Sequence, residues 1–277
     1  MTVVLTSVTV WVARSVLDGT PDDVTPVRDS LVFLRSSLDG GSGEAAQELF
    51  PEGYYFSHAL HGLAITDLAE AGHIDPGEAR RQARLALDRL ESPAGTQAFH
   101  AGLRPTHGVF YAGWTLLLRA QAAALAGEAL DGGERDWVTQ EADALASAFG
   151  DNLDRGGSPF LMAYPNQSWP VDSVVAVAAL RRADRVSGDD HGPLIERWLA
   201  RAAELHDPRT GLLPHKTDHD TGRALEGARA TSQSIIQRLW PIVDPASAPE
   251  TYRRFRTHFV ASSSGFGGSC VRVARTL

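Results

Sequence analysis

Clusters of aromatic and polar residues stand at the start of several apolar segments, and they hold the residue types that could do chemistry. The candidate proton-transfer residues are two carboxylates and two histidines: Asp172, Glu226, His58 and His107. Cleavage or migration of a C–O bond needs a proton donor for the leaving oxygen and a base nearby, and these groups can divide those roles. The candidate binding residues are aromatic, amide or basic: Tyr54, Tyr55, Tyr111, Trp114, Tyr164, Asn166, Gln167, Trp169, His215, Arg229 and Gln233. Such a lining suits a small neutral organic substrate.

Each of these residues also has a purely structural interpretation. Trp169 and Pro170 read as the N-cap and first position of a helix, so Asp172 in its first turn can simply accept backbone N–H bonds. His107 follows Thr106, which we expect to be an N-cap, and its imidazole can equally be a structural hydrogen-bonding group. A single aromatic residue is more often part of a core than of a pocket, and the repeated position of these residues at helix starts makes the two interpretations about equal.

The sequence predicts neither a metal site nor an organic cofactor. His58 and His61 are three residues apart and share a helix face, but no third ligand is apparent. Asp218, His219 and Asp220 are interpreted as turn residues rather than as metal ligands. The chain contains no Gly-x-Gly-x-x-Gly, Walker, Gly-x-Ser-x-Gly or His-Glu-x-x-His motif. Nucleotide-dependent and serine-hydrolase chemistry are therefore disfavoured.

Composition describes an ordinary globular chain. Its 277 residues are 43% hydrophobic and carry a formal net charge of −8. An acidic chain without a basic stripe cannot neutralise phosphates, which excludes nucleic acid as an expected partner. The only cysteine is Cys270, so neither a disulfide framework nor a Cys-based zinc site is expected. Cytoplasmic and membrane-associated locations both stay open.

Between residues 21 and 260, mostly apolar helices alternate with amphipathic ones. After a first amphipathic helix at 24–38, the expected apolar helices are 59–71, 109–125, 170–186 and 231–243, and their amphipathic partners are 77–90, 134–149, 193–205 and 249–260. The pairs repeat at about 50 to 65 residues, as in helix-pair arrays. A helix that is apolar all round must be covered on all sides, whereas its partner needs cover on one face. We therefore expect an all-α protein, an α/α toroid with inner helices around an axis and outer helices facing water.

The chemistry-bearing clusters stand at the leading ends of the inner helices, so we expect them at one mouth of the ring. One insertion interrupts the helices, where segments 207–211 and 218–222 share the form Asp-x-x-Thr-Gly. In such a turn Asp caps the backbone and Gly takes a positive φ. A short strand at 212–216 between the turns predicts a β-hairpin that carries His215 and Lys216 to the same mouth.

Two terminal segments are expected to lie outside the toroid. Residues 1–20 are apolar and β-branched, yet they complete neither a membrane-spanning helix nor a signal peptide with its basic start. We expect a strand or helix packed on the domain, and the alternative is a membrane-proximal segment. Residues 261–277 are rich in Gly and Ser and are expected to form an irregular tail.

Three motifs resemble the linalool dehydratase/isomerase-like family. They are Phe-Pro-Glu-Gly-Tyr at 50–54, Tyr-Pro-Asn-Gln-Ser-Trp-Pro-Val-Asp at 164–172 and Thr-Gly-Leu-Leu-Pro-His at 210–215. The resemblance covers about residues 25 to 260; the second motif is the specific one, and the turn motif also occurs in other α/α barrels. It implies an (α/α)6 barrel. It also implies acid/base dehydration and isomerisation of a small terpenoid alcohol without an organic cofactor.

The sequence departs from the family pattern in two respects. The family site includes cysteines, whereas the only cysteine here is Cys270 in the tail, so no cysteine role is carried over. Six helix pairs need more chain than residues 21–260, so the expected barrel is incomplete. An unfinished ring would expose apolar inner faces, and we expect a homo-oligomer to cover them.

Three functions follow from these residues. The leading interpretation is a lyase or isomerase-like enzyme acting on a small, largely apolar alcohol. The alternative is a carbohydrate-active barrel, a hydrolase or an epimerase, in which Trp114 and Trp169 stack on sugar rings and Asp172 and Glu226 are the two carboxylates. A non-catalytic, degenerate binding domain is the third interpretation, and the incomplete ring is its reason.

Overall fold

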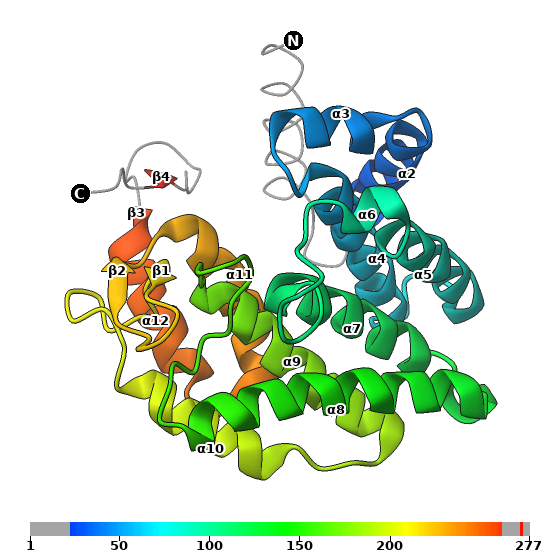
Figure 1. Ribbon diagram of the computed structural model, residues 1–277. Coiled ribbons are helices and arrows are strands. Elements are labelled where there is room, and N and C mark those ends of the chain that lie inside the picture. Colours follow the sequence, from blue (N-terminus) through cyan, green and yellow to red (C-terminus); the bar gives the residue numbers. More distant parts are fainter. Residues whose placement is uncertain (1–22, 262–271, 274–277) are drawn as a thin grey trace. The chain divides into compact units, whose positions relative to one another are not determined.

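The computed structural model describes residues 23–261 and 272–273 (Figure 1). These residues are mostly helical with two short antiparallel strand pairs, which confirms the all-α class. They form two compact units: unit 1 ends at Gly95 and unit 2 begins at Thr96. The toroid and the homo-oligomer expected to cover it stay predictions. The predicted N-terminal segment, 1–20, and most of the predicted tail, 261–277, lie outside the described residues.

Unit 1 is built around one mostly buried helix. Its helices are α2 (Thr25–Asp39), α3 (Ser42–Leu49), α4 (Gly53–Glu70) and α5 (Pro76–Leu90), and α6 (Pro93–Thr96) follows at its end. Helix α4 packs against α2, α3 and α5. The start of α5 is fixed by the Asp75 carboxylate, which accepts the backbone N–H of Glu78 at 2.8 Å, and Pro76 occupies the first position.

Helix α4 begins six residues before the predicted start at Ala59, so that prediction was wrong. A Cβ at Gly53 would lie 2.3 Å from the backbone of Ala46, and only glycine allows α3 and α4 to approach so closely. Tyr54, Tyr55 and His58 therefore lie within the first turns of the helix and are buried there.

Unit 2 holds three pairs of helices, in which α7 (Gly108–Ala124), α9 (Pro170–Ser187) and α11 (Ala230–Val243) are each followed by an amphipathic helix. The amphipathic helices are α8 (Gly132–Asp154), α10 (Gly192–Ala203) and α12 (Ala248–Phe259), and a 3₁₀ turn, η1 (Gly127–Ala129), precedes α8. Helices α7 and α9 are mostly buried, whereas α11 buries only one face, so the prediction that segment 231–243 is covered on all sides was wrong. Helix α9 packs against α7, α8 and α11, and all its residues from 170 to 180 are buried (Figure 1). The predicted apolar stripe of α8 is confirmed, because Val138, Ala142, Leu145 and Phe149 are at most 1% exposed.

The hairpin lies later in the chain than predicted. Strands β1 (Lys216–Thr217) and β2 (Ala224–Glu226) pair antiparallel, whereas the strand was predicted at 212–216. Leu212 and Leu213 are instead buried in the core, and the Leu212 carbonyl accepts the N–H of Asp207 at 2.8 Å. A second pair joins β3 (Val260–Ala261) to β4 (Arg272–Val273).

Both Asp-x-x-Thr-Gly turns are confirmed. The Asp207 carboxylate accepts the N–H of Arg209 at 3.0 Å, and Gly211 has φ +66°. The Asp218 carboxylate accepts the N–H of Thr221 at 2.8 Å, and Gly222 has φ +75°. Among the described helices, none has the length and apolar character needed to cross a bilayer.

Candidate functional site

The loop from Tyr164 to Gln167 turns the chain just before α9. The Gln167 N–H donates to the Tyr164 carbonyl at 2.9 Å, and Asn166 takes φ +59°. Proline at the second position and a positive φ at the third fit a type II turn, and asparagine tolerates that φ better than most residues. Asn166 is exposed at the tip of the turn, so its type is explained by the backbone as well as by the predicted binding role.

This loop is tied to the hairpin by backbone and side chain together. The Ser168 carbonyl accepts the N–H of Thr217 at 3.0 Å, and the Lys216 ammonium donates to Gln167 Oε1 at 3.2 Å. The same ammonium lies 5.1 Å from the centroid of the Trp169 ring, within cation–π range. Trp169 is the N-cap residue and Pro170 the first helical residue of α9, as predicted.

A chain of ring contacts extends from Trp169 to the start of α7. Tyr164 meets Trp169 edge-on at 5.8 Å and stacks with Phe99 at 6.1 Å. Phe99 in turn lies 5.4 Å from Tyr111, and Tyr111 lies 4.9 Å from His107. The structure thus brings together four predicted residues of two segments. Phe99 was missed; its only signal was that it is the single large aromatic residue between residues 91 and 106.

The predicted N-cap of α7 was wrong. His107 rather than Thr106 occupies that position, with φ +66°, and its side chain makes no capping bond. A Cβ at Gly108 would lie 2.5 Å from the Ala163 carbonyl oxygen, so the helix start is pressed against the segment that leads into the loop. Trp114, two turns into α7, is 4% exposed and belongs to the core.

The Tyr111 hydroxyl is held in its neutral form. Burial, with the charge of Glu141 nearby, raises the pKa of Tyr111 to about 12. Burial also raises the pKa of Glu141, although Arg119 lies 3.1 Å from its carboxylate and opposes that shift. The Tyr111 hydroxyl also forms a hydrogen bond with Thr115, so this residue has a structural partner and is unsuited to accepting a proton at neutral pH.

His215 is held as a neutral imidazole beside charged groups. Its Nδ1 lies 2.9 Å from Ser232 Oγ, and that hydroxyl donates to the Arg229 carbonyl at 3.3 Å. The hydroxyl oxygen can thus accept a hydrogen bond from Nδ1–H of His215. In that tautomer Nε2 carries no proton and is the acceptor of the ring. Burial lowers the pKa of His215, as do the charges of Arg229 and Lys216, while Glu226 opposes them. His215 therefore has the properties of a general base at neutral pH.

The other polar residues of this cluster have structural partners. Arg229 pairs with Glu226 at 2.5 Å, and the Glu226 carbonyl accepts the N–H of His215 at 3.2 Å. Gln233 is fully buried and donates to the Leu213 carbonyl at 2.8 Å. Asp172 is 5% exposed in the first turn of α9, at the positive end of the helix dipole.

The remaining predicted residues belong to unit 1. Tyr54 and Tyr55 are buried in α4, and the ring of Tyr54 lies 4.7 Å from that of His58. Burial and the charge of Arg89 lower the pKa of His58 to about 4, so this histidine is neutral at physiological pH. His58 and His61 line a hollow of about 50 Å³. Residues 23–261 contain no group of three His, Cys, Asp or Glu side chains placed to hold a metal ion.

Fold and geometry together define a mostly helical protein whose second unit places a lysine over one ring of an aromatic cluster and a neutral histidine at the preceding position of the chain. Comparison of the chain with protein-family models gave no match, and comparison with curated proteins gave none either.

Proposed function

We propose that unit 2 carries an acid/base lyase or isomerase site for a small, largely apolar alcohol, and that it needs no organic cofactor. The observation that carries the proposal is His215 itself: a half-buried, neutral imidazole whose Nδ1 faces Ser232 at 2.9 Å. Neutral imidazole is the form that accepts a proton. The motif resemblance to linalool dehydratase/isomerase-like proteins supports the same chemistry.

The proposed dehydration divides two proton transfers between neighbouring residues. His215 takes a proton from the carbon next to the carbinol carbon, while the Lys216 ammonium gives one to the leaving hydroxyl. The C–H and C–O bonds break, a C=C bond forms and water leaves. The proton gained by the imidazole then returns to the lysine, which restores both groups. The half-buried ring of Tyr164, which meets Trp169 edge-on, supplies an apolar surface for the substrate.

The carbohydrate alternative has less support from the geometry. It needs two available carboxylates, yet Glu226 pairs with Arg229 at 2.5 Å. It also needs an open aromatic face, and the Lys216 ammonium lies over Trp169. Dense hydrogen bonding to a sugar would have to replace both interactions.

Product analysis with a tertiary terpene alcohol such as linalool, and with an oligosaccharide, tests the proposal. We expect alkene from the alcohol, and we expect His215→Gln to lower turnover about 100-fold or more, the usual contribution of a general base. His219→Gln is the matched control, since His219 lies in the same hairpin beside Asp220 and outside the cluster. Product from the oligosaccharide alone, no product from either compound, or equal loss in both variants would overturn the proposal.

A further inference from the structure

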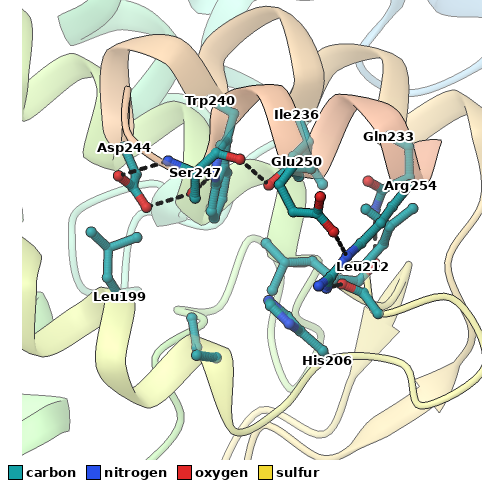
Figure 2. Close-up of a pocket in the computed structure, with 15 residues that line it drawn as sticks. Leu199, His206, Leu212, Gln233, Ile236, Trp240, Asp244, Ser247, Glu250 and Arg254 are labelled. Carbon is teal, nitrogen blue, oxygen red and sulfur yellow. Dashed lines mark hydrogen bonds and ion pairs between the residues drawn. The ribbon is translucent and has the colours of Figure 1, made fainter. Parts of the chain in front are cut away.

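A hollow in unit 2 lies among α10, α11, α12 and the turn before the hairpin (Figure 2). Its volume is about 220 Å³. Apolar side chains from these segments line much of it, among them Leu199, Leu212, Ile236 and Trp240. A dry engineered cavity of about 150 Å³ binds benzene, so this hollow has room for a somewhat larger ring compound.

Most polar groups at the rim of the hollow form hydrogen bonds or ion pairs with one another. Ser247 Oγ accepts the indole N–H of Trp240 at 2.9 Å and donates to Asp244 at 2.5 Å. Arg254 donates to Glu250 at 2.8 Å and to the Gly211 carbonyl at 3.0 Å (Figure 2). A ligand that sought these groups would first have to break those bonds.

His206 is the exception. In the described part of the chain its imidazole makes no hydrogen bond, although its side chain lines the hollow (Figure 2). Burial and the charge of Arg254 lower its pKa, so the ring is neutral at physiological pH. A neutral imidazole offers one donor and one acceptor to a ligand.

The charges around the hollow select against an ionic ligand. An anion would meet the carboxylates of Asp244 and Glu250, whereas a cation would meet the guanidinium of Arg254. Because those groups are paired or hydrogen-bonded within the rim, they attract a charged ligand only weakly. A neutral molecule avoids both penalties.

We propose that this hollow binds a neutral ring compound with one hydroxyl group, of the phenol class, whose hydroxyl hydrogen-bonds to His206. The site is separate from the one proposed for catalysis. Among the residues that line the hollow, only Gln233 was also predicted as a catalytic or binding residue. The ring occupies the apolar floor beside Trp240. The hydroxyl lies at the rim. There it exchanges the hydrogen bond that it makes with water for one with the His206 imidazole.

Calorimetric titration of the full chain with p-cresol, toluene and 4-methylbenzoate tests the proposal, because the three probes share one ring and differ in one group. We expect p-cresol to bind about 2- to 12-fold more tightly than toluene, the factor that one net hydrogen bond gives. The charged 4-methylbenzoate should bind least. In His206→Leu, the advantage of p-cresol over toluene should disappear. Equal binding of p-cresol and toluene to the unchanged protein would overturn the role of His206.

A blocking variant separates the hollow from the rest of the surface. Ala203, exposed at the rim, lines the hollow, whereas Ala200 is exposed on the same helix and does not. Ala203→Phe should abolish p-cresol binding, and Ala200→Phe should leave it unchanged. Retained binding in Ala203→Phe would overturn the site. His215→Gln should bind p-cresol as the unchanged protein does, so failure of the proposed catalysis and failure of this site give different results.

Discussion

Nδ1 of His215 lies 2.9 Å from the hydroxyl oxygen of Ser232, across 17 positions of sequence that include the whole hairpin. The first turn of α11 thus fixes the orientation of an imidazole that belongs to another segment. Ser232→Ala removes this bond, and we expect turnover to fall about 2- to 12-fold. Ser234→Ala is the control, because Ser234 is exposed and donates to the Thr231 carbonyl, away from His215.

The pH dependence of turnover distinguishes a positioning role of Ser232 from a merely structural one. Loss of the bond should change the acid limb of the pH–rate profile, on which His215 gains its proton, whereas a general loss of stability would leave the shape of the profile unaltered. Nuclear magnetic resonance of the imidazole protons measures the same pKa directly. An unchanged profile in Ser232→Ala would contradict the assignment.

Asn166 tests whether the turn or a ligand determines the residue type. With φ +59°, the position should accept glycine, and Asn166→Gly should keep both stability and turnover. Asn166→Val should lower the free energy of unfolding by about 1 to 3 kcal/mol, because a β-branched residue is strained at positive φ. Denaturant unfolding measures the stability effect. A large loss of turnover in a stable Asn166→Gly protein would instead favour the predicted binding role.

Gly108 tests the contact that sets α7 against the loop. Gly108→Ala would place a Cβ 2.5 Å from the Ala163 carbonyl oxygen at φ +86°, and we expect it to cost about 2 kcal/mol or more. Gly150→Ala is its matched control in α8, where an added Cβ meets nothing within 4 Å. In Gly150→Ala we expect the free energy of unfolding to rise by about 0.5 to 1 kcal/mol, because alanine has the higher helix propensity. Thermal unfolding of both variants checks the opposite signs.

His58 makes unit 1 sensitive to acid. Its pKa is about 4 in the folded protein, below the usual value, so the unfolded chain binds its proton first as pH falls. Stability should therefore decrease as pH falls from about 6.5 towards 4 and should lose no more through this group below that range.

Stability curves over pH 4 to 7 test this expectation with two variants. His58→Phe should make the curve less steep without removing its slope, because burial also lowers the pKa of His61 in the same unit. His73→Phe, which replaces an exposed histidine of the same unit, should leave the slope unchanged. An unchanged slope in His58→Phe would show that another group is responsible.

Local rules predicted the helices well, because their signals lie in adjacent residues. Pro170 at the first position of α9 is an example, and it was confirmed. Predictions failed where distant segments decide the outcome. Gly53 extends α4 because α3 lies against it, and Leu212 leaves the strand because the core buries it. The boundary at Gly95 had no compositional signal.

The candidate site was predicted only in part, for the same reason. We expected the hairpin to lie near the loop from Tyr164 to Trp169. The hydrogen bond between Lys216 and Gln167, which are 49 positions apart in the sequence, confirms this. The partnership of His215 with Ser232 was not expected, because no periodicity relates a loop to a helix start. The hollow beside His206 was missed altogether, since its walls come from three helices and a turn.

Residues 170 to 180 of helix α9 are all buried, and the helix packs against three other helices. A segment so enclosed can reach solvent only when those neighbours separate from it. Its amide hydrogens should therefore be the last in unit 2 to exchange with deuterium, at a rate set by the opening of the whole unit. The loop residues Gln167 and Ser168, which bond to the hairpin, are thus attached directly to the element that we expect to open last.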